Sequence, residues 1–324
     1  MGGPGSPPVV AEVVRSGFVE GRHHGTVVAL RADGATAFEV GDVRAPVFPR
    51  SSNKPMQAVA VLRAGLDLPP DLLAVAAASH SGEPAHLERV CRILAGAGLD
   101  ESALRNTPDL PLHVPSAHEH LRGGGRPDSL HQNCSGKHAA MLAACVRAGW
   151  PVDSYLDPDH PLQRLVRQVI EESAGEPVAA VGVDGCGAPL FAVSLLGLAR
   201  AFRRLVLAPA GTPQRRVADA MRTHPDLVGG TGRDVTALMA GLPGCVAKDG
   251  AEGVYAAALP DGTAVALKVE DGAARARVPV MVEALRRLGV DAPVLGELAE
   301  TPVLGHGRPV GAVRATLPTA RPRG

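Results

Sequence analysis

Residues 48–57 read FPRSSNKPMQ, and at this stretch the chain changes from predicted strands to predicted helices. Ser51 and Lys54 are three residues apart, a spacing that puts two side chains on one face of a helix. Pro55 fits a first helical turn, because its missing N–H would have no partner there. The stretch predicts a serine nucleophile activated by an amine at a helix N-terminus. An N-cap serine beside a solvated lysine is the alternative.

The segments on either side of this stretch predict an α+β fold. Residues 9–48 alternate between apolar and polar in short runs, which indicates an antiparallel meander. Strands are expected again at 253–259 and 263–269, joined by a Pro-Asp-Gly turn. Strands from both chain ends would form one antiparallel sheet flanked by helices. The predicted helices span 53–66, 71–78, 84–98, 136–148, 161–173, 190–206, 213–223 and 277–288.

Three other segments carry weaker patterns. Residues 100–132 are rich in Pro, His and Gly and are expected to be irregular, and residues 178–183 suggest a short buried strand. A Pro-rich tail follows residue 288. We therefore predict a disordered lead-in at 1–8 and one catalytic unit at 9–315. This unit can divide into a sheet from 9–50 and 245–315 and a helical middle at 51–240.

Composition excludes several classes of function. The 324 residues contain 33 basic and 33 acidic side chains, one Trp, two Tyr and five Phe, so neither charge nor stacking favours nucleic acid. No apolar run approaches the roughly 18 residues of a membrane span. The first residues, MGGPGSPPVV, lack a basic start and an apolar core, so a cytoplasmic location is expected. Five cysteines, an odd number, favour reduced thiols over a disulfide framework.

Lysine is rare in this chain. Only four of the 33 basic residues are lysines, and the other 29 are arginines. A buried lysine can lose its proton and act as a base or a metal ligand, whereas arginine stays charged. Each lysine is therefore a candidate for chemistry, with chance survival on the surface as the alternative. The four lysines are Lys54, Lys137, Lys248 and Lys268.

A second motif, Ser79-His80-Ser81-Gly82-Glu83, follows the apolar run LLAVAAA. A hydroxyl delivered there by a buried element can relay protons or stabilise an oxyanion, which makes Ser79 a candidate. The alternative is an N-cap for the helix near Pro84, with Ser81 or Glu83 as the capping residue.

A third motif, Lys248-Asp249-Gly250, precedes a predicted strand. A lysine on or beside an edge strand, followed by Gly250, would leave room for a substrate to approach the backbone. An ordinary turn is the alternative. Ser-x-x-Lys, Ser-x-Ser and Lys-x-Gly occur here in the order of the motifs of penicillin-recognising serine hydrolases.

A fourth constellation has the composition of a metal site. Cys134, Lys137 and His138 lie within one helical turn, and Cys186 follows a predicted strand about 50 residues later. Two thiolates and a nitrogen ligand suit Zn²⁺. A buried cysteine pair and a redox pair are the alternatives. Asp184 is expected either to orient a metal ligand or to bind a substrate amino group.

These motifs together resemble the L-asparaginase II family of the thermolabile Rhizobium type. The chain has Lys-Asp-Gly where that family more often has Lys-Thr-Gly, a difference that concerns the surroundings of Lys248. The matching stretches lie at 13–25, 48–57, 78–86, 133–142, 182–189, 248–259 and 266–276 and cover nearly the whole chain.

The resemblance implies hydrolysis of L-asparagine to L-aspartate and ammonia, a serine β-lactamase-like fold and a homodimer. It places two Ser–Lys tandems on Ser51 with Lys54 and on Ser79 with Lys248. It also implies zinc near the substrate, helping binding more than chemistry, with Asp184 in the substrate site. The implied zinc ligands are Cys134, Lys137 and Cys186.

From these motifs we expect acyl transfer in which Lys54 takes the proton of Ser51 as Ser51 attacks the side-chain amide. Ser79 with Lys248 would relay protons or orient water. Arg50 is a candidate for bidentate binding of the substrate carboxylate, with a structural role as the alternative. His138 is a substrate-site candidate whose alternative is a structural hydrogen bond.

Three other functions remain open at this point. The nearest is a related serine hydrolase, such as a glutaminase or a penicillin-recognising enzyme. A zinc-binding protein without catalysis is the second, and an interaction module is the third. The absence of repeats and the clustering of rare lysines speak against the interaction module.

Overall fold

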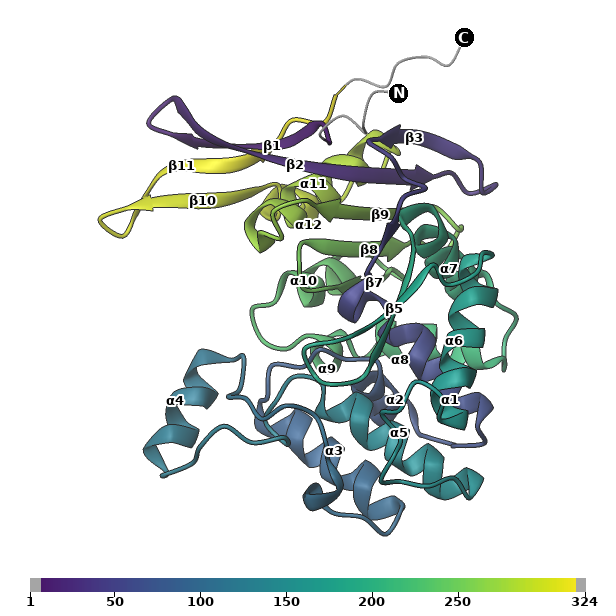
Figure 1. Cartoon of the computed structure of the whole chain (residues 1–324). Helices are drawn as coiled ribbons and strands as arrows, with labels where there is room; N and C mark the ends of the chain where they lie inside the picture. Colours follow the sequence, from purple (N-terminus) through teal and green to yellow (C-terminus); the bar gives the residue numbers. More distant parts are fainter. Residues whose placement is uncertain (1–6, 319–324) are drawn as a thin grey trace.

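A computed structural model describes residues 7–318; residues 1–6 of the predicted lead-in lie outside the described residues. The order of elements confirms the predicted α+β class (Figure 1). The strands are β1 (Val9–Arg15), β2 (Phe18–Leu30), β3 (Thr36–Val40), β4 (Pro46–Val47), β5 (Ala180–Val183), β6 (Pro189–Ser194), β7 (Val246–Asp249), β8 (Val254–Ala258), β9 (Ala264–Val269), β10 (Glu300–Gly305) and β11 (Arg308–Ala315).

Helices occupy most of the middle of the chain. A 3₁₀ turn, η1 (Arg50–Asn53), leads directly into the first α-helix, and η2 (Glu101–Ala103) is a second short turn. The α-helices are α1 (Lys54–Arg63), α2 (Pro70–Ala76), α3 (Pro84–Gly96), α4 (Val114–Arg122), α5 (Ser135–Ala148), α6 (Pro161–Ala174), α7 (Leu195–Leu207), α8 (Pro213–Thr223), α9 (Pro225–Val228), α10 (Asp234–Gly241), α11 (Ala274–Arg287) and α12 (Pro293–Glu297). Within residues 7–318, none is both long enough and apolar enough to cross a membrane.

Strands from both chain ends form one antiparallel sheet, as predicted. Its order is β10-β11-β1-β2-β9-β8-β7, and β3 pairs with β2 beside this path. The long strand β2 joins the two halves, because residues 18–24 lie along β1 and residues 25–30 lie along β9. Strands β1, β10 and β11 and the first half of β2 extend beyond the helical part in Figure 1. Strand β7 is an edge strand and faces the helical part.

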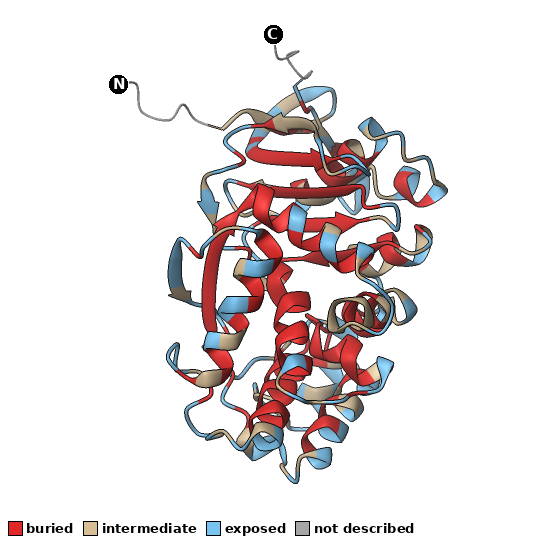
Figure 2. Ribbon diagram, turned by 90° about the vertical axis from the view of Figure 1, so that its right-hand side faces the viewer, coloured by how far each residue is buried: buried red, intermediate tan, exposed pale blue. Residues whose placement is uncertain are grey.

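The inner half of the sheet is covered on both faces. Consecutive residues of β8 are all buried, and so are residues 25–30 of β2. Since successive side chains of a strand point to opposite faces, both faces need cover. Helices α7 and α11 both pack against β8 and β9 and provide this cover. Figure 2 shows the buried residues concentrated along these inner strands and the central helices.

The structure corrects two predictions around residues 178–206. Residues 189–194 form β6 rather than the start of a helix, because this short apolar run pairs with both β4 and β5. Strand β5 exists as predicted but is exposed rather than buried, and Val183 is 79% exposed. It is exposed because it lies at the edge of the small β4-β6-β5 sheet.

Two further predictions need correction. Residues 100–132 are not irregular throughout, since α4 has formed within them. The residues after 288 are more than a Pro-rich tail, because α12 precedes the β10–β11 hairpin, which extends the sheet through β1. Two short valine-containing runs on either side of Gly305-His306-Gly307 are the pattern that indicates this hairpin.

Helices α2 and α5 pack closely, and this contact positions two of the predicted motifs. A Cβ atom at Gly136 would collide with the backbone carbonyl and side chain of Val75. The missing side chain therefore lets the start of α5 lie against α2. Cys134 and Lys137 flank this contact, and Ser79 follows the end of α2.

We predict that Gly136→Ala lowers the free energy of unfolding by about 1–3 kcal/mol or more, since the added methyl group overpacks this contact. Gly96→Ala is the matched control, because a Cβ there meets nothing within 4 Å at the end of α3. Gly96→Ala should leave the free energy of unfolding unchanged or raise it by up to about 1 kcal/mol. Urea unfolding of both variants measures this, and equal stabilities would contradict the close packing.

Candidate active site

Lys54 is the centre of the candidate site. It is the first residue of α1, and its side chain is fully buried. Its Nζ donates to the Ala78 carbonyl at 2.7 Å, to Ser79 Oγ at 3.0 Å and to Cys134 Sγ at 3.2 Å. Lys54 thus brings together three of the four predicted motifs, which lie up to 80 residues apart in the chain.

Ser51 lies in η1, one turn before Lys54, and is half-buried. The serine hydroxyl that Lys54 contacts is that of Ser79. The Lys54 backbone N–H donates to the Ser51 carbonyl, but across residues 7–318 no hydrogen bond joins the two side chains. The four-carbon stem of Lys54 carries its amine past the turn and into the interior at Ala78. The structure therefore combines a member of each predicted Ser–Lys tandem.

Lys248 lies on the edge strand β7, as predicted, but is fully buried. Its Nζ donates to the backbone carbonyl of Asp249 at 2.8 Å and to Asp249 Oδ1 at 2.6 Å. Burial lowers the pKa of Lys248 to about 8, because the Asp249 carboxylate offsets only part of the lost hydration. Lys248 can therefore change protonation state near neutral pH, as an acid–base group must.

Asp249 is the anionic centre of a buried charge network. It accepts from Arg233 at 2.7 Å and from Arg277 at 3.2 Å, in addition to Lys248. Burial opposes the charged form of Asp249, but these three cations outweigh it and hold the pKa of its carboxyl far below the usual range. Asp249 is thus a permanent anion that positions the Lys248 amine.

Arg233 joins the second predicted tandem. Ser79 and Lys248 make no direct hydrogen bond in the described part of the chain, but Arg233 contacts both the Ser79 carbonyl, at 3.4 Å, and Asp249. Sequence reasoning missed Arg233 and Arg277, because nothing in the pattern separates a buried arginine from the other 27.

The structure gives Gly250 a role other than the one predicted. A Cβ at Gly250 would lie 2.7 Å from the Pro49 carbonyl and 3.1 Å from Ser52 Oγ. The space at Gly250 is therefore filled by the turn that carries Ser51, and not left for a substrate. Ser52 Oγ also donates to the Lys248 carbonyl at 3.0 Å, which fixes η1 on β7.

The predicted metal ligands are close together and buried. Lys137 Nζ donates to Cys186 Sγ at 3.1 Å, and the two thiols Cys134 and Cys186 are hydrogen-bonded. That bond, aided by the charge of Lys137, lowers the pKa of Cys186 to about 5, whereas it raises the pKa of Cys134 to about 12. Two sulfurs and an amine converging in this way form a donor set that fits Zn²⁺.

Arg50 and Asp184, both predicted to bind substrate, pair with each other. Arg50 Nε donates to Asp184 Oδ1 at 2.8 Å, and Arg50 lies in the left-handed region at φ 50°. A non-glycine residue there is uncommon and is found at functional sites. Burial opposes ionisation of Asp184, but Lys137 and then Arg50 lower its pKa. The site thus keeps one cation and one anion side by side.

His138 lies behind the site rather than at its surface. It is fully buried, and its Nδ1 lies 2.7 Å from the Tyr155 hydroxyl. Burial lowers its pKa well below the usual value, so it is neutral. The Tyr155 contact is the structural hydrogen bond that the sequence left open as an alternative. The Nε2 atom has no partner among residues 7–318.

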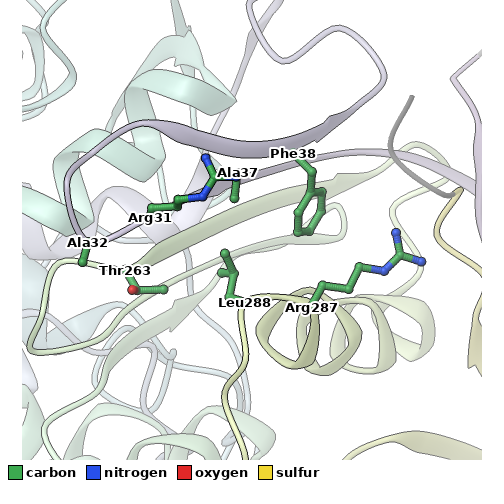
Figure 3. Close-up of a pocket in the computed structure, with 7 residues that line it drawn as sticks. All are labelled: Arg31, Ala32, Ala37, Phe38, Thr263, Arg287 and Leu288. Atoms are coloured by element: carbon green, nitrogen blue, oxygen red, sulfur yellow. The ribbon is translucent and has the colours of Figure 1, made fainter. Parts of the chain in front are cut away.

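Two cavities help to locate the site. One, of about 540 Å³, opens beside Arg50 and is also lined by Phe48, Val183, Glu252 and Lys268. Another, of about 690 Å³, lies between β3, β9 and α11 and is lined by Arg31, Phe38 and Arg287 (Figure 3). None of the predicted site residues lines the second cavity, so the first is the one beside the candidate chemistry.

The comparison of this chain with known families agrees with the motifs. Residues 11–315 match the family model described as L-asparaginase II. The class of protein that this match defines is an amidohydrolase. The chain belongs to the L-asparaginase II family, which confirms the family predicted from the motifs. No significant match was found among curated proteins.

Several solved structures are similar to this chain at low sequence identity. A β-lactamase from Mycobacterium bovis has 15% identity and a TM-score of 0.43, over 77% of this chain and 88% of that one. The hydrolase EstCE1, with promiscuous acyltransferase activity, has 11% identity and a TM-score of 0.45, over 82% of this chain and 93% of that one. A Bacillus glutaminase has 11% identity and a TM-score of 0.38, over 85% of this chain and 88% of that one.

We predict that Lys248 titrates with a pKa of about 8 in the folded protein. Its folded pKa is depressed from 10.5, so the unfolded chain binds more protons between these values and stability rises with pH through this window. Asp249→Asn should lower the pKa further, because it removes the favourable charge.

NMR of protein labelled at lysine Cε measures this directly, since only four lysines contribute signals. Asp153→Asn, at an exposed site, is the control and should leave the titration unchanged. A Lys248 signal that titrates near 10.5 in the wild-type chain would contradict the desolvation.

Proposed function

We propose that this protein hydrolyses L-asparagine to L-aspartate and ammonia through a serine nucleophile activated by Lys54. The observation that carries the proposal is a fully buried lysine hydrogen-bonded to one serine hydroxyl, one turn after a second serine. Membership of the L-asparaginase II family supports the choice of substrate. The half-buried Ser51 is the better exposed of the two serines, since Ser79 is only 5% exposed.

In the proposed reaction, Ser51 Oγ attacks the side-chain amide carbon, and its proton passes through the Ser79 hydroxyl to neutral Lys54. A neutral Lys54 keeps two of its three hydrogen bonds as a donor and accepts the third from the Ser79 hydroxyl at 3.0 Å. The proton then leaves with the amide nitrogen as ammonia, and an ester on Ser51 remains. Water hydrolyses this ester, with Lys54 and Ser79 again exchanging the proton.

The Arg50–Asp184 pair suits the α-amino-acid part of asparagine. The α-carboxylate of the substrate can pair with the Arg50 guanidinium, and its α-ammonium with the Asp184 carboxylate. The substrate would replace the existing ion pair with two new ones, so charge stays balanced as water is excluded. The cavity of about 540 Å³ beside Arg50 is within the size range of small-molecule sites.

We further propose that Cys134, Lys137 and Cys186 hold Zn²⁺. When bound, the ion would supply positive charge near the substrate. Lys137 already contacts Cys186, and Lys54 already contacts Cys134, so the two groups of residues share one buried region. The homodimer predicted from the resemblance and the cytoplasmic location stay predictions.

We expect Ser51→Ala to lower ammonia release from L-asparagine at least about 1,000-fold while the protein stays folded, since the nucleophile is lost. Ser79→Ala should lower ammonia release about 100-fold to 10,000-fold, because one proton-transfer group contributes that much to the rate. A coupled assay of ammonia, run with and without added zinc, measures both. Ser102→Ala, at an exposed site, is the control.

The outcomes separate the alternatives. Near-normal turnover by Ser51→Ala with none by Ser79→Ala would move the nucleophile to Ser79. Ammonia release from L-glutamine and not from L-asparagine would make the protein a glutaminase. No release from either amide would favour the zinc-binding alternative.

Asp184→Asn should raise KM for L-asparagine about 10-fold to 100-fold, because a charge-assisted hydrogen bond contributes about 1.5–3 kcal/mol. Succinamate, which has the same amide but no α-ammonium group, tests the role directly. The wild-type enzyme should prefer asparagine to succinamate, and the variant should lose most of that preference. A variant that discriminates as well as the wild type would exclude Asp184 from ammonium binding.

A further inference from the structure

The segment from Asn106 to Gln132 leaves the helical part and returns to it, and the proposed reaction uses none of its side chains. It contains α4, which stands away from the body of the molecule in Figure 1. Four of the twelve histidines of the chain lie between residues 113 and 131. Three side chains of this segment, His120, Asp128 and His131, converge although they come from different turns.

The donor atoms of these three side chains have separations that suit a single ion. All three lie within 4.8 Å of one another. His131 Nδ1 is 2.8 Å from both carboxylate oxygens of Asp128, and His120 Nε2 is 3.6 Å from Asp128 Oδ2. Ligands at about 2.1 Å from a tetrahedral or octahedral ion are separated by roughly 3.0–3.4 Å, so only small shifts are needed.

The backbone holds this arrangement in place. Asp109 and Asp128 form an isolated antiparallel bridge, and the His131 N–H donates to Asp128 Oδ1 at 2.8 Å. A Cβ at Gly125 would collide with the His120 ring, so the glycine lets the chain fold back beneath it. His120 Nε2 donates to the Arg126 carbonyl at 2.8 Å, which holds the ring beside the other two side chains.

Space for water or a further ligand lies next to the cluster. His120 and His131 both line a cavity of about 430 Å³, together with Gly82, Pro84 and Ser116. The side chains of His120 and His131 are 17% and 16% exposed, and that of Asp128 is 42% exposed. The three donors are thus partly shielded but accessible to an ion from solution.

We propose that His120, Asp128 and His131 bind a divalent transition-metal ion of the zinc type. Two imidazoles and a carboxylate are ligands that such ions favour, and water from the cavity can complete the coordination. Without the ion, one imidazole proton joins His131 to Asp128 and another joins His120 Nε2 to the Arg126 carbonyl. On binding, the metal replaces the first proton, and the second moves to His120 Nδ1. This site is separate from Cys134, Lys137 and Cys186, and uses no sulfur.

The ion would lock the segment at its base, next to the candidate active site. Gln132 Oε1 accepts from Asn106 Nδ2 at 3.0 Å and from the Cys134 N–H at 2.9 Å. Thr107 Oγ1 donates to the Gly185 carbonyl at 2.9 Å. Both ends of the segment therefore contact the stretches that carry the predicted zinc ligands, and a metal at its base would restrict their motion.

Titration of the metal-free full-length chain with Co²⁺ tests the proposal. We expect one bound equivalent that gives weak visible bands without a thiolate-to-cobalt charge-transfer band, because its donors are nitrogen and oxygen. His131→Ala and His120→Ala should each lower the affinity for this Co²⁺ ion at least about 100-fold. His118→Ala, on the exposed side of the same helix, is the matched control and should keep it.

A second readout does not depend on cobalt spectra. Zn²⁺ should slow tryptic cleavage after the exposed Arg122 in the wild-type chain and in His118→Ala, but not in His131→Ala. Circular dichroism checks that each variant is folded. Equal Co²⁺ stoichiometry in the wild type and His131→Ala, or equal protection of Arg122 in both, would overturn the proposal.

Discussion

The site depends on one constraint, which is that the amine of Lys54 is buried and must be hydrogen-bonded. A buried amine without partners would cost several kcal/mol, so its acceptors must be in place when the chain folds. They come from the end of α2 and the start of α5, at Ala78, Ser79 and Cys134. The hydrogen bonds of the Lys54 amine therefore fix the relative positions of α1, α2 and α5, and with them the positions of the candidate nucleophiles and metal ligands.

Three of the four lysines are fully or almost fully buried, and each has a different kind of partner. Lys54 contacts a carbonyl, a hydroxyl and a thiol, Lys248 contacts a carboxylate, and Lys137 contacts the thiol of Cys186, whose pKa is lowered. These partners differ in charge, so they stabilise the protonated amine to different extents. One residue type is thus held in three different electrostatic environments within one region.

The surrounding arginines and glycines hold the candidate site residues in position. Arg233 and Arg277 keep Asp249 ionised, so that Lys248 always faces an anion. Gly136 and Gly250 allow close backbone contacts that bring α5 against α2 and η1 against β7. Larger residues at either glycine would push apart the elements that carry Cys134, Lys137, Ser51 and Lys248, even though neither glycine takes part in chemistry.

The sequence by itself determined the family, the α+β class, most helices and the residues that meet in the site, because these follow from local periodicity and short motifs. Only the tertiary structure decided which serine contacts Lys54, that Arg50 pairs with Asp184, and that Arg233 connects Ser79 to Asp249. It also decided that residues 189–194 form a strand and that His120 meets His131. Such pairings depend on how side chains from distant segments pack, and a pattern of spacing along the chain contains no information on those distances.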